Sequence, residues 1–226
     1  MNEQKIFNKH PKVSLVTDDS IYTLSESYGR GYVIGDKTYP SITTVVGIRN
    51  EEHIQKWKEK VGQEEADRVS KRATTKGTMV HLLVEHYIEN QPLPPCSNML
   101  ATLAFQSIQP VLKRRLNNIV CQEVPLFSHK LRLAGRVDCI AEFDGVLSII
   151  DFKTASKQKE EEWIENYFIQ ETAYAIMFEE MTGIAIEQIV TVIAVDHDTP
   201  QVFIKKPVYR KELIETRKKF YKRYGI

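Results

Sequence analysis

The dipeptide Asp144-Gly145 constrains the fold of this chain more than any other short segment. It lies between two apolar runs in the stretch GRVDCIAEFDGVLSIIDFKTA, where an Asp-Gly pair is the strongest short-range signal for a two-residue β-hairpin turn. With both residues in the loop, Phe143 must pair with Val146. The sequence therefore predicts two antiparallel strands whose register is fixed by the turn.

That register brings two acidic residues together, because it places Asp138 directly opposite Asp151. Side chains alternate between the two faces of a strand, so Arg136 and Lys153 are expected on the same face as the acids. Directly opposed carboxylates destabilise a strand pair unless a positive charge lies between them. A magnesium ion would supply that charge, since it binds one or two carboxylates and completes its coordination with water and phosphate oxygens.

A ladder of ion pairs on an exposed sheet face is the alternative interpretation of these four charged residues. Three apolar residues argue against it, because the alternation places them on the same face as the acids: Ile140, Leu147 and Ile149. Such a face is expected to be mostly buried, and four buried charges would be costly without a ligand. A buried ligand site is therefore favoured.

Hydrophobic periodicity predicts both helices and strands along the rest of the chain. Strands are expected near residues 119–127, 131–143, 146–152, 187–195 and 201–206, and a small β region in YVIGDKTYPSITTVV, residues 32–46. Helices are expected over residues 51–73 with a division at Gly62, over 78–90 after a break at Gly77, from Ser97 or Asn98 to about 118, over 160–181, and in the basic C-terminal segment. This order of elements predicts an α/β fold.

Composition indicates one globular domain, since 226 residues with 42% hydrophobic and 27% charged content can form a sizeable core. The formal net charge of +1 neither favours nor excludes a polyanionic partner. Residues 205–226, however, contain nine basic and two acidic residues, which gives a net charge of +7. This segment is either a solvated helix face or a surface that attracts phosphate groups.

Two further features bear on the compartment and on metal clusters. The N-terminal segment MNEQKIFNKHPK lacks the apolar core of a secretory signal, and no stretch approaches the roughly 20 apolar residues that span a bilayer. A soluble, cytoplasmic protein without a membrane partner is expected. The cysteines Cys96, Cys121 and Cys139 show no CxxC spacing, so they predict core thiols and neither a disulfide framework nor a metal cage.

The residues of the hairpin resemble those of the PD-(D/E)xK nucleases, and within them the RecB-type branch with its pattern G-x-V-D … I-x-D-x-K. Here the pattern reads GRVD at residues 135–138 and IIDFK at residues 149–153. The helix that follows carries Gln170 and Tyr174 in QETAYA, which is similar to the Q-x-x-x-Y motif of the family.

Upstream segments extend the resemblance to roughly residues 39–178. GTMVH, ending in His81, is similar to the segment that supplies a helix histidine to the metal site of the RecB-type branch. YPSITTVV, followed by a helix with Trp57, resembles the mitochondrial genome maintenance exonuclease and its phage relatives. The resemblance implies a restriction-endonuclease-like core with a central mixed β-sheet flanked by helices. It implies one nuclease domain over residues 1–226, with an N-terminal β and helical region (about 1–95), a catalytic core (about 96–206) and a basic C-terminal helix (about 207–226).

The resemblance also implies roles for individual residues of the site. Asp138 and Asp151 would be metal ligands, with the carbonyl group of Phe152 adding an oxygen. Lys153 would be the catalytic lysine, which orients or deprotonates the attacking water and offsets developing charge. His81 would be a further ligand, although imidazole matches magnesium poorly. An additional carboxylate would come from Glu85 or Glu123, and Glu123 is preferred because an acid in an apolar strand has more need of a partner.

Contacts with nucleic acid are assigned to residues of three kinds. The first kind is residues with small hydroxyl groups, which suit phosphate oxygens, and the second is an arginine, whose charge attracts the phosphate backbone. The third kind is a glutamine and a tyrosine four positions apart on one helix face, for which packing or capping of a loop is the alternative role. The residues are Ser41, Thr43, Thr44, Arg136, Gln170 and Tyr174.

The activity that the resemblance implies is that of a magnesium-dependent DNA exonuclease, with manganese able to substitute, acting on single-stranded ends or flaps in replication, repair or recombination. No iron–sulfur cluster is expected, because relatives with a cluster use four cysteines. One alternative is a structure-specific endonuclease with the same site. A catalytically inactive nucleic-acid-binding module would be expected to lack Asp138, Asp151 or Lys153, and a metal-free hydrolase of sugars would not need the lysine.

Overall fold

Two β-sheets contain the strands in the described part of the chain. The structure is a computed structural model that describes residues 5–15, 18 and 20–226. A small antiparallel sheet has the order β1-β2-β3, formed by β1 (Tyr22–Glu26), β2 (Gly29–Ile34) and β3 (Lys37–Pro40). The central sheet has the order β4-β5-β6-β7-β8, formed by β4 (Leu116–Ser128), β5 (Leu133–Phe143), β6 (Val146–Ala155), β7 (Gln188–Val195) and β8 (Gln201–Lys205).

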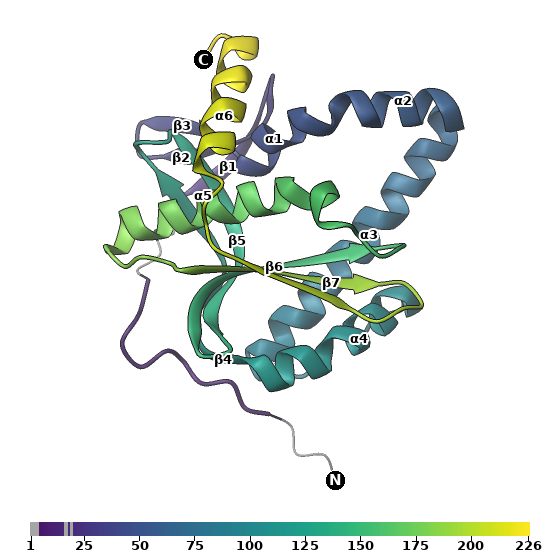
Figure 1. Ribbon diagram of the computed structural model, residues 1–226, viewed down its shortest axis with the longest axis vertical. Coiled ribbons are helices and arrows are strands. Elements are labelled where there is room, and N and C mark those ends of the chain that lie inside the picture. The colour runs from purple at the N-terminus through teal and green to yellow at the C-terminus, as the bar shows by residue number, and fades with distance from the viewer. Residues whose placement is uncertain (1–4, 16–17, 19) are drawn as a thin grey trace.

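Helices cover both faces of the central sheet (Figure 1). The helices are α1 (Ile42–Gly47), α2 (Glu51–Val61), α3 (Gln63–Ile88), α4 (Met99–Arg115), α5 (Glu165–Thr182) and α6 (Arg210–Tyr224), with 3-10 turns η1 (Ile48–Asn50) and η2 (Glu161–Ile164). The apolar side chains of α1, α5 and α6 pack on one face, and those of α3 and α4 pack on the other. The predicted α/β class and the central mixed sheet flanked by helices are confirmed.

The hairpin of β5 and β6 has the register that its turn predicts. Phe143 lies opposite Val146, and the pairing continues to Cys139 opposite Ile150. Asp144 and Gly145 have positive φ angles of 53° and 81°, as the favoured two-residue hairpin turn requires. The pairing between the two strands then stops, one position before the two aspartates.

A crossover through α5 places β7 parallel to β6. Parallel neighbours cannot be joined by a tight turn, and a helix is the usual connection. One side of α5 therefore packs on the sheet, while α1 and α6 lie over its other side (Figure 1). Most of α5 is buried as a result, including polar residues in its middle, Gln170 to Thr172. None of the helices in the described part of the chain is long and apolar enough to cross a bilayer.

Three expectations about the helices need correction. Residues 42–47, expected in a β region, form α1. The expected break at Gly77 is absent, because α3 continues through it from Gln63 to Ile88. A single glycine inside a helix costs only about 1 kcal/mol relative to alanine, which the packing of Val80 and its neighbours outweighs. The third correction concerns the end of α4, which was expected near residue 118. The helix ends at Arg115, because strand β4 begins at Leu116.

Gly135 in β5 is a position where close packing excludes any side chain. A Cβ atom there would lie 2.8 Å from Ile42 Cγ2 and 2.8 Å from Tyr174 Cε1. We expect Gly135→Ala to lower the free energy of unfolding by about 1–3 kcal/mol, the usual cost of overpacking. Gly77→Ala is the matched control, since nothing lies within 4 Å of its Cβ position, and it should be neutral or stabilising by up to about 1 kcal/mol. Urea unfolding of both variants tests this, and equal stability would contradict it.

Candidate active site

Three acidic residues lie level with one another on adjacent strands of the central sheet. In β4 and β5, Gln122 lies opposite Cys139 and Val124 opposite Val137, which leaves Glu123 level with Asp138. Continuing the hairpin register in the same way leaves Asp138 level with Asp151. Neither of these two positions forms a regular ladder pair, so the sheet is locally open where the acids meet.

The backbone of Glu123 explains part of this opening. Its φ angle is +49°, in the left-handed region that non-glycine residues seldom adopt. Outliers of this kind cluster at functional sites, where the surrounding structure imposes them. The carbonyl oxygen of Glu123 accepts a hydrogen bond from the Arg136 guanidinium, which holds the altered backbone against the neighbouring strand.

Asp138 is held by the main chain of the strand beside it. The N–H of Phe152 donates to Asp138 Oδ2 at 2.8 Å. If the hairpin ladder continued, this N–H would be expected to pair with the carbonyl group of Val137. The carboxylate takes that place instead, which fixes it between the two strands.

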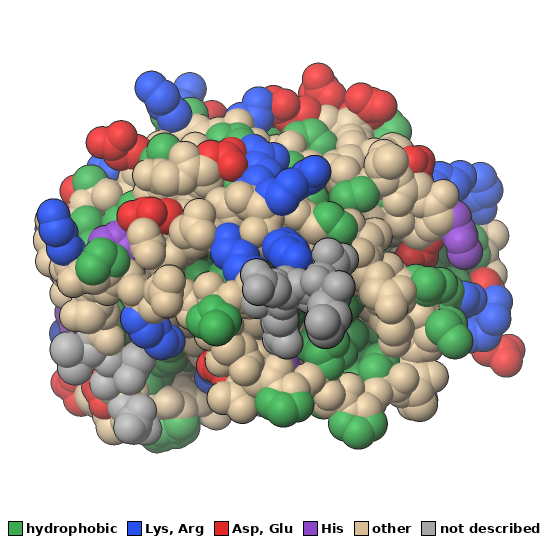
Figure 2. All heavy atoms as spheres, turned by 90° about the horizontal axis from the view of Figure 1, so that it is seen from below, with side chains coloured by type: hydrophobic (Ala, Val, Ile, Leu, Met, Phe, Trp, Pro, Cys, Tyr) green, Lys and Arg blue, Asp and Glu red, His purple; other side chains and the backbone are tan. Residues whose placement is uncertain are grey.

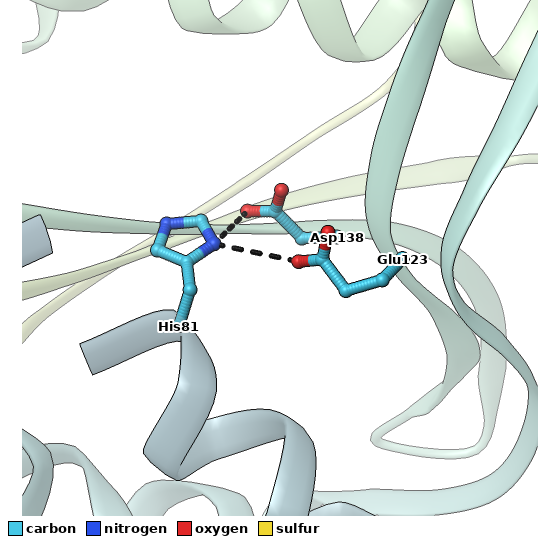
Figure 3. Close-up of side chains that lie close together, drawn as sticks. All are labelled: His81, Glu123 and Asp138. Carbon is cyan, nitrogen blue, oxygen red and sulfur yellow. Dashed lines mark ion pairs between the residues drawn. The ribbon is translucent and has the colours of Figure 1, made fainter. Parts of the chain in front are cut away.

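His81 completes a group of three possible ligands. Its ring projects from α3 toward the carboxylates of Glu123 and Asp138 (Figure 3). His81 Nδ1 lies 3.6 Å from Glu123 Oε1 and 3.6 Å from Asp138 Oδ2. One ligand atom from each of the three residues lies within 4.8 Å of the others. The structure thus brings together residues from a helix and two strands that are far apart in the sequence.

The two carboxylates control the protonation of His81. Burial alone would lower its pKa, but the charge of Asp138 and the contact with Glu123 raise the pKa to about 9. Because the pKa of His81 lies above its ordinary value of 6.5, the interaction of protonated His81 with the two carboxylates stabilises the metal-free protein fully below pH 6.5. The stabilisation is lost as the pH rises from 6.5 to about 9.

We expect Glu123→Gln to lower the pKa of His81 and to flatten the pH dependence of stability above pH 6.5. Nuclear magnetic resonance titration of the imidazole in EDTA and urea unfolding midpoints at several pH values would measure both effects. His53→Gln, on the exposed α2, serves as the control and should leave the pH dependence unchanged. An unaltered His81 titration in Glu123→Gln would contradict the assignment of this pair.

Asp151 and Lys153 form a second, deeper part of the site. Asp151 is buried, and its Oδ2 forms an ion pair with Lys153 Nζ, while Gln170 Nε2 donates to its Oδ1 at 3.1 Å. Burial raises the pKa of Asp151 to about 6, against the opposing effect of Lys153. Burial would lower the pKa of Lys153, but the charges of Asp151 and Asp138 outweigh it and raise that pKa above its ordinary value. Lys153 is therefore a cation at neutral pH.

Glu171 is a buried acid that the sequence does not single out. Its side chain is fully buried, and it accepts a hydrogen bond from Thr191 Oγ1. Glu171 Oε2 has no hydrogen-bond partner among the described residues. Burial, reinforced by the charge of Asp151, raises the pKa of Glu171 well above its ordinary value. The only sequence signal is its position beside Gln170 in the middle of a helix that is rich in apolar residues.

Gln170 and Tyr174 lie inside the protein and not on a surface for nucleic acid. Gln170 fixes the Asp151 carboxylate, and the Tyr174 hydroxyl donates to the carbonyl oxygen of Arg136 at 2.8 Å. Both side chains are buried, 5% and 2% exposed. Their burial favours the packing alternative over contact with nucleic acid, and their hydrogen bonds position β5 and β6.

The other residues assigned to nucleic-acid contact differ in exposure. Ser41 is 1% exposed, and its hydroxyl shares a hydrogen bond with Thr43 Oγ1 at 2.9 Å, so it belongs to the packing of α1 and not to a binding surface. Thr43 and Arg136 are exposed, and Thr44 is half-buried. Glu85 lies with His81 and Glu123 around one shallow opening on α3 but outside the three-residue group. Its pKa is raised by burial and by the charge of Glu123.

The donor set fits a divalent cation. Two carboxylates and one imidazole converge beside the buried carboxylate of Asp151, which is itself paired with Lys153. Carboxylate oxygens suit magnesium and manganese, whereas an imidazole ligand favours a transition metal such as manganese over magnesium. Asp151 and the carbonyl group of Phe152 lie outside the three-residue group, so their predicted ligand roles stay predictions.

Comparison with known proteins identifies the family. A model of the PD-(D/E)XK nuclease superfamily matches residues 49–222, which is most of the chain. The chain therefore belongs to the PD-(D/E)XK nuclease superfamily. Members are nucleases and generally use divalent metals, so the substrate class is nucleic acid.

Two further comparisons add little to this assignment. A solved structure titled "Crystal structure of SSO0001" is 13% identical to this chain, with a TM-score of 0.47, and the match covers 83% of this chain and 77% of that one. That likeness is too distant to bear on function. No curated protein matches the chain.

Proposed function

We propose that this protein is a metal-dependent DNA exonuclease of the RecB-type branch, one domain that hydrolyses phosphodiester bonds at single-stranded ends or flaps during replication, repair or recombination. The observation that carries the proposal is the convergence of His81, Glu123 and Asp138 beside the Asp151–Lys153 ion pair. The segment ending in His81 and the segment ending in Asp138, more than 50 residues apart in the sequence, are adjacent at this point. The relation to the mitochondrial genome maintenance exonuclease is part of the same proposal.

The proposed roles follow from the geometry of the side chains. His81, Glu123 and Asp138 would hold the cation, which polarises a phosphodiester and lowers the pKa of a bound water when present. Magnesium is proposed as the physiological ion, with manganese able to substitute. Asp151 and the carbonyl group of Phe152 are proposed as additional ligands once the cation is bound.

Lys153 is proposed to act through its charge. Because its pKa is raised, the ammonium group keeps its proton at neutral pH and can donate hydrogen bonds. It would orient the attacking water and offset the negative charge that develops on the phosphate, an effect that preorganised charges make large. Tyr167, whose ring centroid lies 5.3 Å from Lys153 Nζ, restricts where that group can point.

End-labelled single-stranded, duplex and circular single-stranded DNA, incubated with Mg²⁺, Mn²⁺ or EDTA, would test the proposal. An exonuclease should shorten the linear single strand progressively with either metal, leave the circle intact and be inactive in EDTA. Cutting of the circle would establish the structure-specific endonuclease instead. Binding without cleavage under every metal condition would indicate an inactive nucleic-acid-binding module.

A further inference from the structure

Charge on the surface does not by itself mark where nucleic acid binds. On the face seen from below in Figure 1, basic and acidic side chains are scattered among apolar ones and form no continuous stripe (Figure 2). A local cluster of cations beside the candidate site is therefore more informative than the overall charge.

Such a cluster lines a pocket of about 430 Å³ between α3, the end of β6 and the first turn of α4. Its cations are Arg68, Arg72, Lys76 and Lys159, and its one acid is Asp196. We refer to it as the basic pocket. Four positive charges against one carboxylate leave its walls with a net charge of +3.

The partners of these cations differ, and the difference shows which are available to a ligand. Lys76, only 7% exposed, is neutralised by Asp196 at 2.8 Å, and Arg68 pairs with Glu65 on its own helix. In the described part of the chain, the side chains of Arg72 and Lys159 have neither a hydrogen bond nor an ion pair. Lys159 is half-buried nonetheless. Two cations in the wall of a pocket whose one acid is already paired with Lys76 favour an anion there.

Neutral groups in the basic pocket add to this preference. Thr154 and Ser156 place two hydroxyl groups in its wall, and hydroxyl groups donate readily to phosphate oxygens. Leu100 brings in the first turn of α4, a helix of 17 residues whose N-terminal end carries partial positive charge. Cations, hydroxyl groups and a helix N-terminus together suit a phosphate group.

The position of the basic pocket relates it to the candidate active site along two elements. Thr154 follows Lys153 directly and lies two residues beyond Phe152, about 6.6 Å along a strand. Lys76 precedes His81 by five residues on α3, about 7.5 Å along a helix. Both places are thus close enough for one nucleic-acid strand to contact them.

We propose that the basic pocket binds a phosphate group of the nucleic-acid strand close to the bond that is cut. This inference rests on the proposed nuclease function and deepens it. Arg72 and Lys159 make the contact, while the Lys76–Asp196 pair fixes the wall between α3 and the end of β7. The pocket would thereby set how the strand is placed over the candidate site.

Binding of a labelled single-stranded oligodeoxynucleotide in EDTA tests the pocket separately from cleavage. We expect Arg72→Ala/Lys159→Ala to weaken binding about tenfold and to reduce the slope of log affinity against log salt by about one. The control is Lys71→Ala/Lys157→Ala, which removes two exposed lysines next to the same residues but outside the pocket and should change affinity less than about twofold. With a cleavable substrate and Mn²⁺, the pocket variant should raise KM more than it lowers kcat.

Several results would overturn the proposal. If both double variants lose the same oligonucleotide affinity, only long-range charge matters. If Arg72→Ala/Lys159→Ala binds the oligonucleotide as tightly as the wild type, the basic pocket is not a binding site. Calorimetry with inorganic phosphate distinguishes the source of the ligand: phosphate binding that the pocket variant loses while it retains oligonucleotide affinity would overturn the assignment to a strand. Wild-type protein that binds DNA as predicted but cuts none with any metal would contradict the proposed function and leave the pocket intact.

Discussion

Lys153→Gln should reduce DNA cleavage at least about a hundredfold while leaving oligonucleotide affinity in EDTA within about threefold of wild type. Lys153 carries its charge next to Asp151, and its pKa is raised by the surrounding carboxylates, so it contributes a fixed positive charge to the site. Glutamine can still donate a hydrogen bond to Asp151 but has no charge to offer a developing phosphate anion. Single-turnover cleavage at saturating Mn²⁺ is the measurement.

Lys157→Ala is the control for this variant, because it removes an exposed lysine four residues further along the chain. It should cut DNA at the wild-type rate. The thermal midpoint of each variant must be compared, since Asp151 loses its cation in Lys153→Gln and its pKa should rise further. Near-normal cleavage by a folded Lys153→Gln protein would rule out the proposed role of the lysine.

Asp138→Asn should weaken Mn²⁺ binding by at least about a hundredfold in calorimetry. Substitutions that only disturb the support of a metal ligand cost about 10–100-fold in affinity, so loss of a ligand should cost no less. The asparagine carbonyl can still accept the N–H of Phe152, which holds the wild-type carboxylate at 2.8 Å. The variant is therefore expected to fold and to lose one negative charge from the three-residue group.

Asp144→Asn applies the same change at the turn of the same hairpin. Asparagine tolerates the positive φ of 53° at this position, and the lost pair with Arg115 is exposed and worth little. Its Mn²⁺ affinity should match that of the wild type. If Asp138→Asn also binds Mn²⁺ normally, Asp138 is not a ligand and the proposed site must lie elsewhere.

The sequence was sufficient to predict the hairpin because a turn signal and strand alternation act over short distances. Asp144-Gly145 determines the register, and every paired position from Phe143 to Cys139 follows from it. The position of His81 beside Asp138 came instead from a resemblance, since no local rule states which face of α3 meets the sheet. The exposed α2 shows the same limit: apolar residues at helical spacing, such as Ile54 and Val61, predicted its helix correctly, yet none of its residues is buried.

The features that the sequence could not predict depend on contacts between distant elements. The positive φ of Glu123 belongs to a residue type that seldom adopts it, and β4 shifts its register against β5 between Asn117 and Cys121. Alternation alone placed Asp138 and Asp151 as an equivalent pair. Their environments differ because α5 supplies Gln170 to one and the main chain of β6 supplies a donor to the other. Burial of Glu171 follows from the same crossover helix.

The hydrogen bond that fixes Asp138 has a consequence for how the site can change. Its donor is a main-chain N–H, which every residue type except proline provides. The side chain of Phe152 can therefore be replaced together with the apolar residues of α3 and α4 that pack on it, as long as the backbone of β6 keeps its position. This gives a physical reason why the motif allows any residue type at the position between the aspartate and the lysine. A designer could exchange the hydrophobic layer on that side of β6 only while keeping His81 in place, because its ring lies edge-on to that of Phe152 at 6.5 Å.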